Sequence, residues 1–301
     1  MKSSSRRFEN VAVLMGGPSS ERDISLKSGS AVTRGLRSAG YSVTGVDVSG
    51  RTIRLPVGTE AVFIALHGEF GEDGTVQAIL QEQRIPYTGS SPEASRNAFD
   101  KRLSKRIFDR AGIPSAPYEV LADPAHRTLS LPVVVKPPCQ GSTIGIFKVA
   151  EEAEWKNAFA ESIRYDGEVL VEAFIPGREL TVGIVGETVL PPIEILAPEG
   201  WYDFHAKYTK GQSRHLCPAP LDASVERQCQ SIALSVFRAL GCRGLGRVDF
   251  RLDPDGNLFV LELNNIPGFT ETSLLPEAAA AAGIEFPELC RRIMEMAALE
   301  E

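Results

Sequence analysis

The residues best suited to chemistry in this chain lie in one late segment, residues 244–273. Its sequence, GLGRVDFRLDPDGNLFVLELNNIPGFTETS, alternates apolar and polar residues on either side of the turn signal DPDGN. This pattern predicts a β-hairpin with strands over residues 245–252 and 258–263. We place the loop at residues 254–257, which fixes the residues that face one another across the two strands.

This register gathers two carboxylates and two other polar side chains on one face of the hairpin. Asp249 would lie directly across from Glu262, and Arg247 across from Asn264, since residues two apart share a face. The opposite, buried face would comprise Val248, Phe250, Leu252, Phe259, Leu261 and Leu263. Opposed carboxylates repel unless a hard cation such as Mg²⁺, typically held by one or two carboxylates and substrate phosphates, lies between them. The hairpin therefore suggests the floor of a metal and phosphate site, the alternative being a solvated acidic face.

The composition is that of an ordinary globular protein and argues against several functional classes. The 301 residues allow two or three domains, and 43% of them are hydrophobic. With 39 acidic and 32 basic residues, the net charge of −7 argues against a binder of nucleic acid or anionic membranes. Five scattered cysteines without a CxxC pair indicate reduced thiols in the cytoplasm. We expect neither a signal peptide nor a membrane span, which needs about 20 apolar residues.

The first 91 residues alternate strand and helix patterns, which is typical of an α/β fold with a parallel sheet. Strands are predicted over residues 10–15, 41–47 and 61–66, and helices over 21–39 and 74–83. Functional residues in such sheets lie on loops at the carboxyl ends of strands. Two polar loops qualify, GGPSSER with Glu21 and HGEFGEDGT with His67. The alternatives are that Glu21 caps the following helix and that His67 is a core histidine.

The rest of the chain has an α+β pattern, and we expect domains at residues 1–91, 92–176 and 177–301. A long helix is predicted at 93–111, followed by strands at 131–136, 146–149 and 168–174 and a helix at 151–163. Further strands are predicted at 179–185 and 189–195, and helices at 223–240 and 286–299.

Charged residues near predicted strand ends suggest a nucleotide site in the middle of the chain. Lys136 ends an apolar strand before the loop PPCQGSTIG, whose backbone N–H groups could wrap phosphate oxygens. Glu172 interrupts the apolar run EVLVEAFI and needs a donor such as a ribose hydroxyl, unless it lies on an edge strand. Glu179 could face the same cavity. Lys101, Lys207 and Tyr208 are further candidates, the last two in a segment, WYDFHAKY, that suits a loop over a ligand. Alone, each lysine would ordinarily be a solvated surface residue.

Taken in order, the motifs resemble those of the D-alanine–D-alanine ligases, a family of ATP-grasp carboxylate–amine ligases. The resemblance rests on VAVLMGGPSSERDISLKSG, FIALHGEFGEDGTVQ, VVVKPPCQGSTIGI, VLVEAFIPGRELTV, YDFHAKY, GRVDF and LELNNIPGFTETSL, and covers nearly the whole chain. It implies an ATP-grasp fold with a Rossmann-like N-terminal domain, and ATP between the later domains. In this family ATP phosphorylates one D-alanine, and the amine of a second attacks the acyl phosphate, giving D-alanyl-D-alanine for peptidoglycan. The resemblance also implies a cytoplasmic homodimer.

The resemblance implies a role for each matching residue. Glu21 and His67 would hold the first D-alanine, and Glu21, Ser142 and Tyr208 would form a hydrogen-bonded triad that closes the site. Lys101, Lys136 and Lys207 would contact phosphates, while Glu172, Ala173, Ile175, Glu179 and Leu261 would hold the nucleoside. Asp249, Glu262 and Asn264 would bind two Mg²⁺ or Mn²⁺ ions. Arg247 and the Gly268 N–H would stabilise the tetrahedral intermediate, and Ser273, Leu274 and Lys207 would receive the second D-alanine.

Two other functions stay open at this point. One is a D-Ala–D-lactate or D-Ala–D-serine ligase, which Tyr208 disfavours because depsipeptide-forming relatives usually rebuild its loop. The other is a non-catalytic nucleotide-binding protein of the same fold, which the intact Asp249, Glu262 and Arg247 argue against. A Rossmann dehydrogenase is excluded because no GxGxxG follows the first strand.

Overall fold

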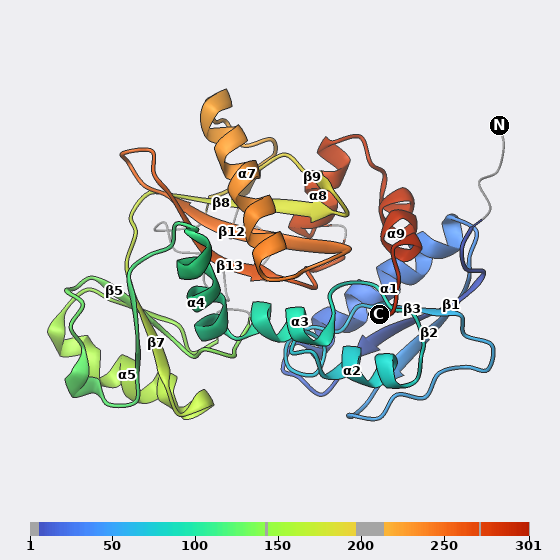
Figure 1. The fold of residues 1–301 in the computed structure, drawn as a ribbon, viewed down its shortest axis with the longest axis horizontal. Helices are drawn as coiled ribbons and strands as arrows, with labels where there is room; N and C mark the ends of the chain where they lie inside the picture. Colours follow the sequence, from blue (N-terminus) through green and yellow to red (C-terminus); the bar gives the residue numbers. More distant parts are fainter. Residues whose placement is uncertain (1–5, 142–143, 197–213, 271, 301) are drawn as a thin grey trace.

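The structure is a computed structural model, and it describes residues 6–141, 144–196, 214–270 and 272–300. Figure 1 shows an elongated molecule with three sheets. The sheet of the first strands, in blue, lies at one end, and the sheet of the middle segment, in green, lies at the other. The sheet of the later strands, in yellow to orange, lies between them. Within the described part of the chain, no helix is long and apolar enough to cross a membrane.

The N-terminal sheet is parallel, as predicted, with its strands in the order β2-β1-β3. Its elements are β1 (Asn10–Gly16), α1 (Arg22–Ser38), β2 (Ser42–Val48), β3 (Ala61–Ile64) and α2 (Thr75–Glu82). The loops after β1 and β3 meet at the carboxyl edge, where the Ser19 hydroxyl donates to the His67 carbonyl at 2.6 Å. This edge therefore brings the two predicted polar loops together.

The long helix predicted over residues 93–111 is wrong, because the structure has two helices there. They are α3 (Pro92–Phe99) and α4 (Lys101–Ala111). Asp100 between them is extended, with φ −82° and ψ 104°, and its carboxylate accepts the Arg102 N–H at 2.9 Å. An aspartate that caps a new helix in this way ends the previous one. The break makes Lys101 the first residue of α4, where it is only 6% exposed, so the expectation of a surface lysine is also wrong.

The middle sheet is antiparallel, with its strands in the order β4-β7-β5-β6. Its elements are β4 (Tyr118–Leu121), the 3-10 helix η1 (Pro124–His126), β5 (Val133–Lys136), β6 (Phe147–Val149), α5 (Glu152–Asp166) and β7 (Val169–Ala173). β4 was not predicted from the sequence. Because β7 lies between β4 and β5, the edge-strand interpretation of Glu172 is wrong. Lys136 at the end of β5 is buried, which also rules out the solvated alternative for that residue.

The largest sheet has the strand order β11-β10-β8-β12-β13, with β9 paired to β8. Its elements are β8 (Arg178–Val185), β9 (Thr188–Val189), β10 (Ile193–Leu196), β11 (Arg214–Leu216), α7 (Ala223–Ala239), β12 (Leu245–Leu252) and β13 (Leu258–Asn264). The single strand predicted over residues 189–195 is therefore two strands. Pro191 and Pro192 lie between them and lack the N–H groups that a continuous ladder requires.

The predicted register of the β12–β13 hairpin is confirmed at the four polar residues of the candidate site. Asp249 pairs with Glu262, and Arg247 pairs with Asn264. Nearer the turn the pairing shifts, and the loop spans residues 253–257, one residue more than predicted. A bulge next to Asp249 absorbs the difference, because it sets one extra residue of β13 against β12.

The bulge also changes which residues of β13 face the core. Leu258 and Val260 are buried and pack in the core under the sheet, whereas Phe259 and Leu261 are half-buried. The prediction that Phe259 and Leu261 would lie on the apolar face is therefore wrong. An extra residue reverses the alternation of side chains along the strand.

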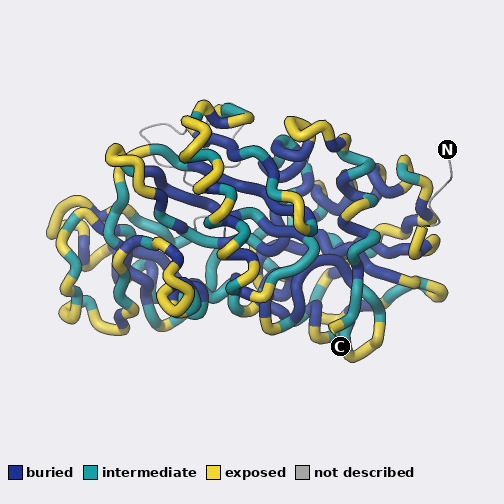
Figure 2. The backbone as a smooth tube through the Cα atoms, turned by 45° about the horizontal axis from the view of Figure 1, so that its top comes forward, coloured by how far each residue is buried: buried dark blue, intermediate teal, exposed yellow. Residues whose placement is uncertain are grey.

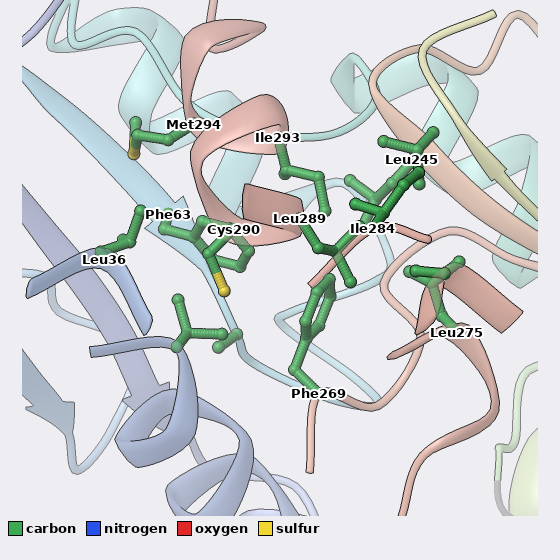
Figure 3. Close-up of a cluster of buried hydrophobic side chains, with 14 of the residues drawn as sticks. Leu36, Phe63, Leu245, Phe269, Leu275, Ile284, Leu289, Cys290, Ile293 and Met294 are labelled. Atoms are coloured by element: carbon green, nitrogen blue, oxygen red, sulfur yellow. The ribbon is translucent and has the colours of Figure 1, made fainter. Parts of the chain in front are cut away.

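The last two helices, α8 (Leu274–Ala281) and α9 (Phe286–Glu295), fold back onto the N-terminal sheet. Figure 3 shows Leu289 and Ile293 of α9 meeting Phe63 of β3 and Leu36 of α1 in one apolar cluster. Figure 2 shows buried backbone running through the molecule and exposed residues gathered on its outer loops. This cluster thus joins residues of the predicted first domain, 1–91, to residues of the predicted third, 177–301, and it ties the end of the chain to its beginning.

Candidate active site

Two adjoining cavities, of about 350 Å³ and 100 Å³, lie where the predicted site segments meet. The larger is lined by Glu21, His67, Lys101, Arg247, Glu262, Asn264, Gly268, Ser273 and Leu274. The smaller is lined by Lys101, Lys136, Glu172, Ala173, Ile175, Glu179, Asp249, Leu261 and Glu262. Every predicted site residue that the structure describes therefore lines one cavity or both. Ser142, Lys207 and Tyr208 lie outside the described residues.

Each carboxylate on the polar face of the hairpin is paired with a basic side chain, and these pairs lie where the two cavities meet. The Arg247 guanidinium donates two hydrogen bonds to the Asp249 carboxylate, both at 2.9 Å. The Thr181 hydroxyl donates to the same carboxylate at 2.5 Å. Across the ladder, the Lys101 ammonium lies 3.2 Å from Glu262. Burial disfavours the charged Lys101, but Glu262 more than offsets this and raises the pKa of Lys101. Each carboxylate of the opposed pair is thus compensated by a basic group.

The donors on this face fit a hard divalent cation that is shared with a phosphate ligand. Asp249 and Glu262 offer carboxylate oxygens from directly opposed positions, and Asn264 adds an amide oxygen that accepts the Ile266 N–H at 3.1 Å. The structure, over its described ranges, contains no group of three or more His, Cys, Asp or Glu side chains arranged for a metal. The remaining ligands would therefore come from water or a nucleotide, as is usual for Mg²⁺.

A buried lysine that the sequence analysis missed, Lys105, pairs with Glu172, which lines the smaller cavity. Its ammonium lies 2.5 Å from one oxygen of Glu172, and the ammonium of Lys136 lies 2.5 Å from the other. All three side chains are nearly inaccessible to solvent. Burial alone would raise the pKa of Glu172, but the two lysines together lower it. Lys105 follows Lys101 by one helical turn on the buried face of α4, and this spacing could have indicated it.

Glu21 joins three loops at the larger cavity. It precedes α1, but its side chain makes no capping hydrogen bond, so the capping interpretation is wrong. A Cβ atom on Gly68 would come within 2.7 Å of the Oε2 atom of Glu21, and a Cβ atom on Gly141 would come within 3.0 Å of the same atom. The carboxylate of Glu21 therefore lies against the backbone of the loop after β3 and of the loop after β5.

His67 lies at the base of the larger cavity, with both ring nitrogens engaged. Nδ1 lies 3.1 Å from the Ile266 carbonyl, and Nε2 lies 3.0 Å from the Ser28 hydroxyl. Glu72, which the sequence analysis did not single out, is 3.7 Å from Nδ1 and lines the same cavity. Burial raises the pKa of Glu72 to about 7, against the opposing effect of His67, and Glu21 raises it further.

Glu72 is expected to make the stability of the protein depend on pH. Its pKa rises from 4.5 to about 7 on folding, so the folded state binds this proton more tightly than the unfolded state. The folded state is therefore most stable, as far as Glu72 is concerned, below pH 4.5, and this advantage is lost as the pH rises through 7 and Glu72 ionises. We expect Glu72→Gln to become more stable relative to the wild type by roughly 2–3 kcal/mol between pH 5 and pH 8.

Urea unfolding of both proteins at the two pH values measures this difference. Glu69→Gln is the matched control, because Glu69 lies in the same loop but is exposed. The Glu72 interpretation fails if the wild type and Glu72→Gln keep a constant difference in unfolding free energy across this pH range.

The far end of the larger cavity is formed by the start of α8. The Ser273 hydroxyl lies 2.7 Å from the Thr270 hydroxyl and accepts the Thr270 N–H at 3.0 Å. A Cβ atom on Gly268 would come within 2.9 Å of the same Ser273 oxygen, so a side chain at this position would displace the hydroxyl. The first turn of a helix offers unpaired backbone N–H groups and a positive dipole end, and both favour an anion here.

Comparisons with known proteins agree with this arrangement. Residues 50–90 match the family described as D-ala D-ala ligase N-terminus, and residues 107–295 match D-ala D-ala ligase C-terminus. A D-alanine–D-alanine ligase of Methylacidiphilum infernorum is 47% identical over 290 residues, which cover 96% of each chain.

Two solved structures are similar over nearly their whole length. The VanG D-Ala:D-Ser ligase of Enterococcus faecalis has a TM-score of 0.85 and 28% identity, over 96% of this chain and 99% of that one. The D-alanine–D-alanine ligase of Bacillus anthracis complexed with ATP has a TM-score of 0.84 and 30% identity, over 96% and 97%. The sequence, the fold and the two cavities thus agree, and the chain belongs to the D-alanine–D-alanine ligase family of ATP-grasp enzymes.

Proposed function

We propose that the protein joins two D-alanines into D-alanyl-D-alanine with ATP, through an acyl phosphate, for peptidoglycan synthesis. The observation that carries this proposal is the pair of cavities that share Lys101 and Glu262. One cavity suits a nucleotide and the other suits small zwitterions, so a phosphoryl group could pass between them at the shared wall.

In the smaller cavity, the residues suit a nucleotide with its phosphates directed toward the shared wall. Lys136 and Lys101 offer the positive charge that phosphates require, and Glu172 and Glu179 offer acceptors for the base and ribose. Asp249, Glu262 and Asn264 would hold Mg²⁺ or Mn²⁺, which when bound neutralises the charge that develops on the phosphates.

In the larger cavity, the two D-alanines would lie one after the other. Glu21, near His67, would accept the ammonium of the first, and the start of α8 at Ser273 and Leu274 would receive the carboxylate of the second; all four residues line this cavity. Arg247 and the Gly268 N–H would donate to the oxyanion of the tetrahedral intermediate.

Three further assignments fall on residues that the structure does not describe. We propose that Ser142 and Tyr208 complete a triad with Glu21, and that Lys207 contacts phosphate and the second carboxylate. An acyl phosphate hydrolyses readily, so a cover that excludes water is needed during the reaction. A homodimer in the cytoplasm is also part of this proposal.

The purified protein is expected to release ADP and phosphate only when D-alanine, ATP and Mg²⁺ are all present. Each omission removes one reactant or the charge compensation that phosphoryl transfer requires. Phosphate release and mass spectrometry of the product, with D-alanine, D-lactate and D-serine offered in parallel, measure this directly. Turnover with D-lactate or D-serine but not with D-alanine as second substrate would overturn the substrate assignment.

A further inference from the structure

His215 lies beside the start of α8 with one ring nitrogen held and the other without a partner. It is on β11, the edge strand of the largest sheet, and it lines the larger cavity. Its Nδ1 atom lies 2.7 Å from the Oε2 atom of Glu277, which is on α8. Among the described residues, its Nε2 atom has no hydrogen-bond partner, although this atom is buried.

A buried ring nitrogen without a partner is unfavourable, so the position of Nε2 calls for a ligand group. Glu277 fixes the orientation of the ring through its contact with Nδ1. The start of α8 lines the same cavity and favours an anion, so the ligand group we assign to Nε2 is an anionic oxygen.

The surroundings of His215 favour the same ligand. The ring lines the same cavity as Ser273 and Leu274, which begin α8, and Glu277 lies on the next turn of this helix. A carboxylate here would meet both the dipole end of the helix and a ring nitrogen that can hydrogen-bond to it. Glu21 and His67, which we assign to the first D-alanine, belong to loops of the N-terminal sheet instead.

We propose that His215 binds the carboxylate of the second D-alanine through Nε2, and that Glu277 is the positioning residue that holds the ring. This inference rests on the proposed function, since it adds a contact to the second substrate site. It makes His215 a determinant of affinity for the amino acid that attacks, and not for ATP or for the D-alanine that is phosphorylated.

The test compares His215→Phe, His215→Gln and Glu277→Gln with the wild type in steady-state ligation. His215→Phe is expected to raise the KM of the second D-alanine by roughly 10- to 100-fold, the loss of one charge-assisted hydrogen bond. The KM values of ATP and the first D-alanine should stay within about twofold. His215→Gln keeps a donor and should recover part of the loss, while Glu277→Gln should show a smaller, equally selective change. His126→Phe is the matched control, because His126 is exposed on η1 in the middle segment.

A second arm replaces the second substrate with D-alaninamide, which lacks the carboxylate. The wild type and His215→Phe should use D-alaninamide with equal KM, because the proposed contact is absent from both. If His215→Phe weakens D-alaninamide as much as D-alanine, or raises all three KM values together, the role of His215 is structural and the inference is overturned.

Calorimetry keeps this test separate from the proposed function. With a non-hydrolysable ATP analogue and Mg²⁺ present, wild-type protein should bind D-alanine at two sites, and His215→Phe should weaken the weaker site alone. Unchanged binding in His215→Phe would overturn the inference even if ligation proceeds. A wild type that fails to ligate would refute the proposed function, and the binding isotherm would still decide the role of His215.

Discussion

Replacing Glu262 with glutamine is expected to lower kcat/KM by roughly 10²- to 10³-fold. Glu262 lies directly across from Asp249 and lines both cavities, so the change removes one of two opposed carboxylates at their junction. It also takes away the carboxylate that lies 3.2 Å from Lys101 and raises the pKa of that lysine. Glutamine keeps the shape of the side chain, and Glu262 is partly exposed, so the fold should be retained.

Two measurements separate the role of Glu262 from a general effect of charge. Turnover is measured across a Mg²⁺ titration, and Mg²⁺ binding is measured by calorimetry with an ATP analogue; both should shift to higher Mg²⁺ in the variant. Asp255→Asn is the matched control, because it removes the same charge from the exposed turn of the same hairpin. Near-normal turnover and Mg²⁺ affinity in Glu262→Gln would contradict the assignment of this residue to the metal site.

The hairpin illustrates how far local sequence can determine a site. Its alternating pattern was enough to oppose Asp249 and Glu262, because side chains change face at every residue of a strand. The bulge was not predictable from that pattern, since it reflects the choice between a four-residue and a five-residue loop. The compensating shift on β13 left the site register correct and moved Leu261 from the expected core face to the wall of the smaller cavity.

The other differences between the sequence-based predictions and the structure are of two kinds. One has a local signal in the sequence, and the others depend on distant parts of the chain. The break before α4 could have been anticipated from Asp100, a favourable capping residue within an otherwise helical pattern. The ion pair of Lys105 could not, because its counter-charge, Glu172, comes from another element 67 positions later. The pairing of His215 with Glu277 is likewise set by how β11 packs beside α8.

The set of site residues was suggested by the resemblance and not by composition or periodicity. No local rule brings Glu21, Lys136 and Ser273 to neighbouring cavities, because each lies in a different segment. The motifs carried that information as an ordered set, and the structure gathers the described members of the set. Local contacts explain instead how each side chain is held in its position. Gly68 and Gly141, for example, have no side chains and so let the Glu21 carboxylate lie against the backbone.

Glu172→Gln is expected to destabilise the protein by about 3–5 kcal/mol, because it leaves two buried ammonium groups without a counter-charge. Lys105 and Lys136 each lie 2.5 Å from this carboxylate and are almost fully buried. Burial and repulsion by Lys136 already lower the pKa of Lys105, and Glu172 opposes both effects. Removing the carboxylate therefore removes what keeps the two lysines charged side by side.

Lys105→Met is expected to cost less, because Lys136 still pairs with Glu172 in that variant. Urea unfolding at pH 7 compares the two variants with Glu168→Gln, a control at the start of the same strand whose more exposed ion pair with Arg102 should contribute little. An equal cost for Lys105→Met and Glu172→Gln would mean that apolar packing of the Lys105 chain, and not charge balance, holds this part of the structure.

The pH dependence of this cost provides a second check on the same residues. The pKa of Glu172 is lower in the folded state than its ordinary value of 4.5, so its stabilising effect is present above that value and is lost as the pH falls. The difference in unfolding free energy between wild type and Glu172→Gln should therefore shrink in acid. Lys105 and Lys136, of which Lys136 lines the smaller cavity, are thus held by a single ionised carboxylate.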